Sequence, residues 1–302
     1  MTIDTIAIMA PGNMGHAIGA HLVREGLRVI TNLEGRSADT KARADKAGMD
    51  DVASDETLVR EADIVLSILP PGRAVAFAQR IAKAIKATSA NPLFVDCNAI
   101  SPATAAEVAG ILDTIGIKCV DAAIRGGSAL AGKPQPRIYA SGPGVAEFQA
   151  LMDYGLDIRD VGPKAGQASG LKMCSAAISK GLVLLTVQAF AAARILGIDD
   201  DLRKELEGNS TVGKAARRAP NLGPDASRWA EEMDEIAATV ASTGLTPKIH
   251  QGMAEFCRFV EATPLGAQKK GQLTLGRDFE EVVEVLAGAV SKDIGLAGGD
   301  PK

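Results

Sequence analysis

Residues Thr5-Ile-Ala-Ile-Met-Ala-Pro-Gly-Asn-Met-Gly15 are the most informative part of the sequence, because a short apolar run leads directly into a glycine-containing turn. Thr5–Met9 reads as a buried β-strand, and apolar residues four positions apart after it predict a helix that packs on a sheet. In such a turn Gly12 lets the backbone approach a pyrophosphate, and Gly15 lets helix and strand pack closely. The helix N-terminus adds free N–H groups. We expect these residues to contact a dinucleotide: Pro11, Gly12, Asn13, Met14 and Gly15.

A turn of this kind can also be purely structural, and alanine stands at position 10 where the usual motif has its first glycine. The surrounding pattern favours the binding interpretation. Further β-like runs alternate with amphipathic helical stretches, at 27–31, 63–69, 92–96, 117–121, 137–141 and 157–161. This alternation is typical of an α/β fold, here a Rossmann-type doubly wound and mostly parallel sheet.

The pattern changes after Gly162-Pro163, where strands cease. Long helical stretches follow at 165–197, 225–243, 247–262 and 278–292, and the segment from Pro220 to Pro224 predicts a loop. A chain of 302 residues is long enough for two domains. We therefore expect an NAD(P)-binding Rossmann domain over residues 1–163 and an all-helical domain over residues 164–302.

Composition excludes several classes of protein. The 33 basic against 37 acidic residues give a net charge of −4, which argues against a nucleic-acid partner, and 46% hydrophobic residues exclude a charge-extended disordered chain. The four cysteines and three histidines show no metal-ligand spacing, so we expect no metal and free thiols in a reducing cytoplasm. We see no secretion signal. Three basic residues interrupt the apolar region 165–198, which predicts a buried helix and no membrane span.

The end of the second predicted strand indicates which nucleotide is bound. An acidic residue there favours the ribose of NAD, whereas Arg and Ser favour the 2′-phosphate of NADP. The chain has Asn32, then Arg36 and Ser37 after a small loop, and we interpret Glu34 as a solvated loop carboxylate. We therefore expect NADP, with NAD as the less favoured cofactor.

Polar or glycine- and proline-rich segments follow three more predicted strands, at Ser67–Pro71, Asp96–Pro102 and Asp121–Gly127. Ligands of open α/β sheets bind at the carboxyl ends of the strands, so the three segments predict one cleft. Each also has a structural interpretation: Asn98 as a helix cap, and Gly126-Gly127 as a tight turn.

A polar stripe then runs along the predicted helix at 165–197. Lys172, Ser175, Ser179 and Lys180 share one face of an otherwise apolar stretch, which indicates burial at a cleft. A lysine in such a place is suited to moving a proton. We interpret the acidic cluster Glu231, Glu232 and Glu235 as a solvated helix face.

Taken together, these motifs resemble the β-hydroxyacid dehydrogenase superfamily, which includes 6-phosphogluconate and 3-hydroxyisobutyrate dehydrogenases. The resemblance covers residues 1 to about 180 and rests on five motifs in the order of the family. They are Ala10–Gly15, Ser67–Pro71, Asp96–Pro102, Asp121–Gly127 and Gly162–Lys172. The helical remainder, around Trp229–Ala237, resembles a phosphogluconate-dehydrogenase-like subgroup whose C-terminal domain has no assigned role.

The resemblance implies a role for each motif. Lys172 would be the general acid/base, and Leu69, Pro70 and Pro71, with Asn98, would border the nicotinamide. The residues that would hold a small, anionic hydroxy or oxo substrate are Asn98, Arg125, Gly126, Gly127, Ser175 and Lys180. The helical domain would form a homodimer, with the active cleft between the domains.

Two positions depart from the family pattern: Arg125 stands where a serine is common, and Ala176 where an asparagine follows the catalytic lysine. Arg125 could pair with a substrate anion or form a structural ion pair. The departures leave alternatives open: an imine reductase-like enzyme, against which Lys172 speaks, a non-catalytic nucleotide-binding sensor or scaffold, and, less well, an S-adenosylmethionine methyltransferase.

Overall fold

The computed structural model describes residues 3–126 and 136–293 of the chain. The chain forms two compact units, Met1–Met173 and Cys174–Lys302. The division falls inside the long helix α7 (Gln167–Leu196), whereas the sequence placed it before that helix.

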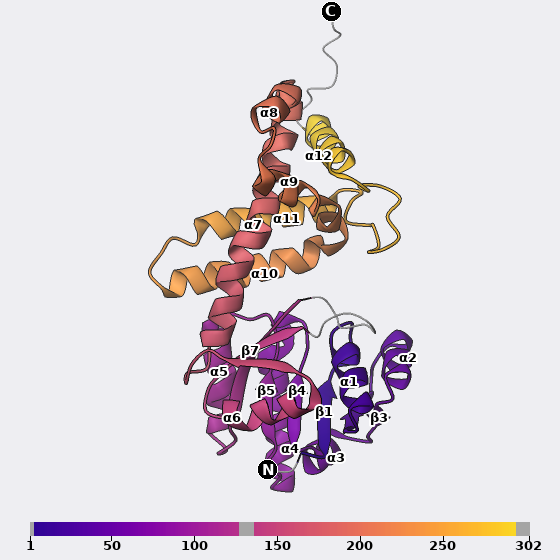
Figure 1. The fold of residues 1–302 in the computed structure, drawn as a ribbon, viewed down its shortest axis with the longest axis vertical. Coiled ribbons are helices and arrows are strands. Elements are labelled where there is room, and N and C mark those ends of the chain that lie inside the picture. The colour runs from indigo at the N-terminus through magenta and orange to yellow at the C-terminus, as the bar shows by residue number, and fades with distance from the viewer. Residues whose placement is uncertain (1–2, 127–135, 294–302) are drawn as a thin grey trace, which may run out of the picture. The chain divides into compact units, whose positions relative to one another are not determined.

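The first unit is built on one eight-stranded sheet (Figure 1). Its strand order is β3-β2-β1-β4-β5-β6-β7-β8, and all neighbours are parallel except the antiparallel pair β6 and β7. The strands are β1 (Thr5–Met9), β2 (Arg28–Thr31), β3 (Asp50–Asp51), β4 (Ile64–Ser67), β5 (Leu93–Asp96), β6 (Cys119–Arg125), β7 (Arg137–Ser141) and β8 (Asp157–Asp160). Since β1 lies between β2 and β4, the chain reverses its direction of winding there, and the loop after β1 lies at this switch point. The predicted doubly wound sheet is confirmed.

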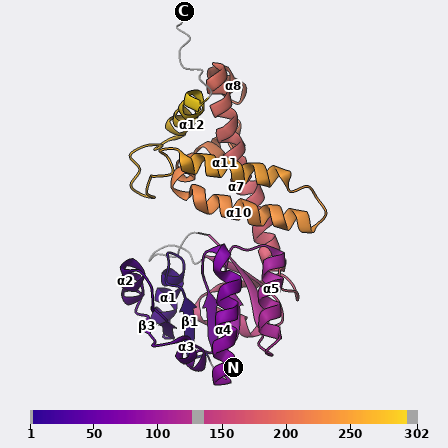
Figure 2. The same cartoon turned by 180° about the vertical axis from the view of Figure 1, so that it is seen from behind.

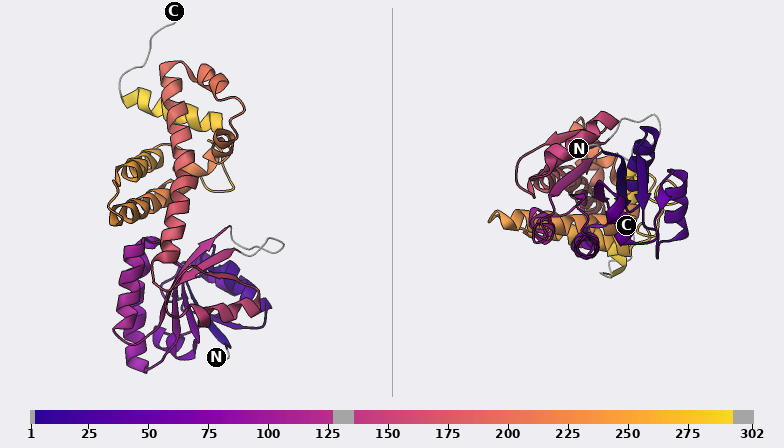
Figure 3. Two further views of the ribbon diagram at one scale, coloured as in Figure 1. Left: turned by 60° about the vertical axis from the view of Figure 1, so that its left-hand side comes forward. Right: turned by 90° about the horizontal axis from the view of Figure 1, so that it is seen from below.

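Helices cover both faces of this sheet (Figures 2 and 3). Side chains of α1 (Gly15–Arg24), α2 (Ala38–Lys46), α6 (Val145–Phe148) and the 3₁₀ helix η2 (Gln149–Tyr154) pack on one face or close beside it. The other face packs against α3 (Asp55–Glu61), α4 (Ala74–Thr88) and α5 (Pro102–Asp113), and the short η1 (Pro71–Arg73) leads into α4. Apolar strand residues are therefore buried on both sides, as a parallel sheet requires.

Several strand bounds differ from the predicted ones by one or two residues, and β6 differs most. The sequence placed the end of this strand, predicted at 117–121, at Asp121, but β6 continues to Arg125. The polar side chain suggested a strand end, yet the Asp121 carboxylate is buried within the strand and fully hydrogen-bonded. The short β3 has no apolar run and was not predicted.

The second unit is helical. After α7 come α8 (Asp199–Glu205), α9 (Ser210–Ala216), η3 (Ala219–Asn221), α10 (Leu222–Ser242), α11 (Lys248–Ala262) and α12 (Phe279–Asp293). The pair α10 and α11 packs along its length. The predicted loop from Pro220 to Pro224 is wrong, because α10 already begins at Leu222. Pro224 lies in its first turn, where the missing N–H costs no helical hydrogen bond.

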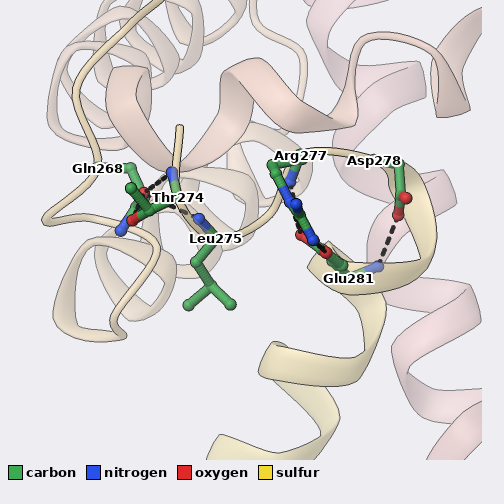
Figure 4. A network of polar contacts seen from close by, with 6 residues as sticks. All are labelled: Gln268, Thr274, Leu275, Arg277, Asp278 and Glu281. Atoms are coloured by element: carbon green, nitrogen blue, oxygen red, sulfur yellow. Dashed lines mark hydrogen bonds and ion pairs between the residues drawn. The ribbon is translucent and has the colours of Figure 1, made fainter. Parts of the chain in front are cut away.

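The long connection between α11 and α12 is held by side chains (Figure 4). The Gln268 Oε1 atom accepts hydrogen bonds from the Thr274 and Leu275 N–H groups at 2.9 and 3.1 Å. Further along, Arg277 pairs with Glu281 at the start of α12, and the Asp278 Oδ1 atom accepts from the Glu281 N–H. These contacts fix a segment that has little regular structure of its own.

Within the described part of the chain, α7 alone is long and apolar enough to cross a membrane by length and composition. The core helix of a soluble protein has the same properties. Its Val183, Leu184 and Val187 are buried in the second unit, but Ile178 and Leu185 are exposed, so the buried helix expected from the sequence is confirmed only in part.

Candidate cofactor and substrate site

The loop between β1 and α1 has the geometry of a phosphate-binding turn. A Cβ atom on Gly15 would lie 2.1 Å from the Ala10 carbonyl oxygen, so only glycine fits there. A Cβ atom on Gly12 would meet no heavy atom within 4 Å, so its surroundings are open. Among the described residues, no hydrogen bond uses the backbone N–H groups of Asn13, Met14 and Gly15. Three N–H groups at a helix N-terminus are thus available to an anion.

Three arginines gather beyond the end of β2. Arg36, Arg73 and Arg80 line a pocket of about 420 Å³, together with residues that include Leu69 and Pro70. Burial, followed by repulsion from Arg80 and Arg73, lowers the pKa of Arg36 below its ordinary value. Like charges held close together indicate a site for an anion. The sequence identified Arg36 but missed Arg73 and Arg80, which the α3–α4 region brings across to the β2 loop.

Asp55 and Asn32 hold Arg80 and the loop after β2 in place through polar contacts. The Asp55 carboxylate pairs with Arg80 at 2.7 Å and accepts from the Asn32 Nδ2 atom at 2.9 Å. Asn32 is buried, and its Oδ1 atom accepts from the Glu34 N–H. The Ser37 hydroxyl caps α2 by accepting from the Thr40 N–H. Asn32 and Ser37 therefore shape the loop that presents Arg36, and Glu34 is exposed as expected.

Asn98 occupies the centre of a buried network at the ends of β4 and β5. Its Nδ2 atom donates to Ser67 Oγ at 2.9 Å and to Asp96 Oδ2 at 2.8 Å, and its Oδ1 atom accepts from the Leu69 N–H. Both amide hydrogens are thus used within the protein, and the side chain is 2% exposed. Asn98 does not cap α5, because Ser101 does so through the Thr104 N–H. The network fixes the backbone at Leu69, just before Pro70 and Pro71.

Asp96 is ionisable, deeply buried and part of this network. Burial raises its pKa to about 7, and the charge of Lys172 opposes that rise. Asp96 ends β5 and lies opposite Asp121 of β6, which accepts a hydrogen bond from the Ser169 N–H on α7, three residues before Lys172. Lys172 itself is half-buried on α7, as is Ser175.

The raised pKa of Asp96 predicts a pH dependence of stability. The folded chain holds this proton up to about pH 7, whereas the unfolded chain releases it near the ordinary aspartate pKa of 3.8. Between these values the folded state binds more protons, so the contribution of Asp96 to stability falls as pH rises, by up to about 1.4 kcal/mol per pH unit. We expect the Tm of the wild type minus that of Asp96→Asn to fall between pH 4 and 7. A constant difference would contradict the raised pKa.

Arg125 ends β6, and its side chain is exposed. It forms no ion pair with any residue that the structure describes, so the structural ion pair considered from the sequence is not seen there. Gly126 follows with φ +126°, a conformation that favours glycine. Gly127 lies outside the described residues.

Lys180 lies in the second unit and interacts with α10. Its ammonium pairs with Glu232 and lies 5.3 Å from the centre of the Trp229 ring. Glu232 also accepts from Arg228 at 2.7 Å. The predicted solvated acidic face is therefore wrong for Glu232, which is 8% exposed because two cations neutralise it.

The fold and the loop after β1 together have the architecture of a dinucleotide-binding α/β domain. Comparison with known proteins agrees. Residues 5–151 match the family described as NAD binding domain of 6-phosphogluconate dehydrogenase. Residues 193–260 match a domain of unknown function, DUF1932.

Relatives extend this similarity over most of the chain. An uncharacterised 28.5 kDa protein of Methanothermus fervidus is 30% identical over 74% of this chain and 86% of its own length. The 3-hydroxyisobutyrate dehydrogenase of Pseudomonas aeruginosa is 26% identical over 94% of this chain and 98% of its own. The solved 3-hydroxyisobutyrate dehydrogenase of Mycobacterium tuberculosis shares the fold, with a TM-score of 0.70 and 23% identity over 94% and 99% of the two chains.

The chain therefore belongs to the β-hydroxyacid dehydrogenase superfamily, in the group whose C-terminal domain is DUF1932. It is an enzyme of that class, an NAD(P)-dependent oxidoreductase acting on a CH–OH group.

Proposed function

We propose that the protein is an NADP-preferring dehydrogenase or reductase of a small, anionic hydroxy or oxo compound, with Lys172 as general acid/base. The observation that supports the mechanism is the attachment of α7 to the sheet three residues before Lys172, through Asp121, which lies opposite the last residue of β5. It brings a proton-transfer group to the strand ends at which α/β enzymes bind their ligands.

The chain's own residues fit the cofactor. The free N–H groups of Asn13, Met14 and Gly15 would hold its pyrophosphate, and the open space at Gly12 would admit it. Arg36, flanked by Arg73 and Arg80, would take a 2′-phosphate. The sequence predicts further neighbours of the cofactor, namely Pro11, Asn32, Ser37, Leu69, Pro70, Pro71 and Asn98.

Proton transfer is the part of the reaction that the protein performs. A bound nicotinamide supplies the acceptor or donor of the hydride. In oxidation, the Lys172 amine removes the proton of the substrate hydroxyl, and in reduction its ammonium returns a proton to the carbonyl oxygen. Arg125, exposed at the end of β6, would pair with the substrate anion, with Gly126 beside it in the chain. Gly127, Ser175 and Lys180 stay predictions from the sequence. The Lys180 ammonium is already neutralised by Glu232, so Arg125 is the better anion partner.

Arg36→Ala is expected to weaken NADPH binding by about 10- to 100-fold, because a charge-assisted hydrogen bond contributes about 1.5–3 kcal/mol. NADH has no 2′-phosphate, so its affinity should change little. Fluorescence titration of both cofactors measures this. Arg60→Ala, which removes an exposed arginine at the end of α3, serves as the control and should alter neither affinity. Equal losses for NADPH and NADH would contradict a 2′-phosphate site at Arg36.

The proposal includes a homodimer formed through the second unit. Ile178, Leu182 and Leu185 are spaced for one side of α7 and are 68%, 38% and 53% exposed. An exposed apolar stripe of this kind on a helix is typical of a protein interface.

We expect the wild type to be a dimer by light scattering and the double variant Ile178→Glu, Leu185→Glu to be a monomer, since two buried charges per subunit would oppose association. Met152→Glu places the same charge on an equally apolar and 48% exposed position of the first unit. That control should remain dimeric. A monomeric wild type, or a dimeric double variant, would contradict this interface.

A further inference from the structure

The first turn of α7, the helix that carries Lys172, is capped by side chains from the sheet. Every α-helix begins with N–H groups that have no acceptor within the helix. A local Ser, Thr, Asp or Asn usually supplies one, but Pro163-Lys-Ala-Gly166 precedes α7 and contains none. The acceptors come instead from β6 and β7.

The Asp121 carboxylate in β6 supplies most of the cap. Its Oδ2 atom accepts from the Gly166 N–H at 2.8 Å and from the Ser169 N–H at 3.0 Å, and its Oδ1 atom accepts from the Ser169 hydroxyl at 2.6 Å. Ser141 in β7 donates its hydroxyl to Asp121 at 3.0 Å and accepts from the Ala168 N–H at 3.0 Å. Asp121, Ser141 and Ser169 are at most 2% exposed.

These contacts fix the helix in more than one direction. Side chains of the neighbouring strands β6 and β7 accept hydrogen bonds from three N–H groups of this turn, those of Gly166, Ala168 and Ser169. On another side, a Cβ atom on Gly166 would lie 3.0 Å from the Pro102 carbonyl oxygen, so the turn also abuts the start of α5. Lys172 follows Ser169 by three residues, about 4.5 Å along the helix. Its position is therefore set largely by this turn.

We propose that Asp121 is a positioning residue for Lys172: its carboxylate, completed by Ser141 and Ser169, fixes the first turn of α7 and thereby the place of the lysine amine. The inference rests on the proposed role of Lys172. Asp121 itself has no part in proton transfer, because four hydrogen bonds occupy its carboxylate. The negative charge also lies at the positive end of the helix dipole, which strengthens the attachment.

The test compares Asp121→Ala with Asp121→Asn in the full-length chain. An asparagine can keep an acceptor for the Gly166 and Ser169 N–H groups and donate its amide to a reoriented Ser169 hydroxyl, whereas alanine removes every bond. We expect alanine to lower kcat by about 100-fold, as 1 Å displacements of catalytic groups do, with KM and NADPH affinity nearly unchanged. Asparagine should restore most of kcat. Activity is measured with NADP and a panel of short hydroxy acids that includes 3-hydroxyisobutyrate.

Amide hydrogen exchange of residues 164–176 provides a readout that needs no substrate. Exchange should accelerate in Asp121→Ala and stay slow in Asp121→Asn. Asn209→Ala is the matched control, since it removes the side-chain cap of α9, a helix without proposed catalytic residues, and should leave kcat unchanged. If Asp121→Ala fails to fold, Ser141→Ala carries the test, because it leaves the Ala168 N–H without its acceptor and should lower kcat by about tenfold.

Unchanged kcat and exchange in Asp121→Ala, or in Ser141→Ala where it replaces that variant, would overturn the inference. So would an Asp121→Asn variant as impaired as the alanine variant, because the hydrogen bonds would then not be the cause. Lys172→Ala separates the two proposals. Full turnover in Lys172→Ala refutes the role of the lysine. If Lys172→Ala loses turnover while the Asp121 and Ser141 variants remain normal, only the positioning role of Asp121 is refuted.

Discussion

Replacing Lys172 with alanine is expected to lower kcat by about 10²–10⁴-fold, the usual contribution of a positioned general acid or base. We propose this amine as the proton-transfer group, because Asp121, opposite the end of β5, binds the turn of α7 that precedes it. The variant should bind NADPH as the wild type does, because the residues proposed to hold the cofactor belong to the β1–α1 loop and the arginine pocket. Steady-state kinetics and cofactor titration together separate the two effects.

The control for this variant is Lys164→Ala, which removes an exposed lysine just before α7. It has the same change of charge and should keep full activity. Turnover of Lys172→Ala at the rate of the wild type would remove the lysine from the mechanism. Cofactor binding without turnover on any hydroxy acid, in the wild type itself, would instead favour the sensor considered from the sequence.

Two glycines of the first loop are expected to respond to alanine in opposite ways. In Gly15→Ala the new methyl group would lie 2.1 Å from the Ala10 carbonyl oxygen and 3.3 Å from Ile8 Cγ2. Backbone cannot yield at that distance without moving α1 from the sheet, so the free energy of unfolding should fall by roughly 1–3 kcal/mol or more. In Gly12→Ala the methyl group meets nothing within 4 Å, so the Tm should not change.

Gly12→Ala should nevertheless weaken NADPH binding, because the methyl group would occupy the space through which a pyrophosphate approaches the backbone. Thermal unfolding gives the Tm of each variant, and fluorescence titration gives its dissociation constant for NADPH. Gly12→Ala with unchanged cofactor affinity would indicate that the turn is structural and binds no dinucleotide, the alternative that the sequence left open.

The sequence predicted those parts of the fold that are written in local patterns. The β1–α1 turn is an apolar run followed by glycines, and β1 and β7 have the predicted bounds. The end of β6 was misjudged because the meaning of a buried carboxylate depends on partners elsewhere in the chain. In the sequence alone, Asp121 resembles a polar residue that ends a strand. In the structure, the hydroxyl groups of Ser141 and Ser169 donate hydrogen bonds to its carboxylate, so it can be buried within the strand.

The same limit applies to the site. Arg36 was predicted from its place after β2, but Arg80 lies on α4, and only the folded chain brings the two guanidinium groups to one pocket. Glu232 illustrates the reverse case. It belongs to a run of acids typical of a solvated helix, and its burial depends on Lys180, which is distant in sequence. Charge partners that lie far apart in the chain leave no periodic signal.

We expect this chain to bind a nicotinamide dinucleotide and to prefer NADP. Fluorescence titration of the purified wild type with NADPH and with NADH is the decisive measurement. The arginine pocket predicts saturable binding of both, with the tighter dissociation constant for NADPH. Tighter binding of NADH would contradict the preference, and no binding of either cofactor would contradict the claim itself.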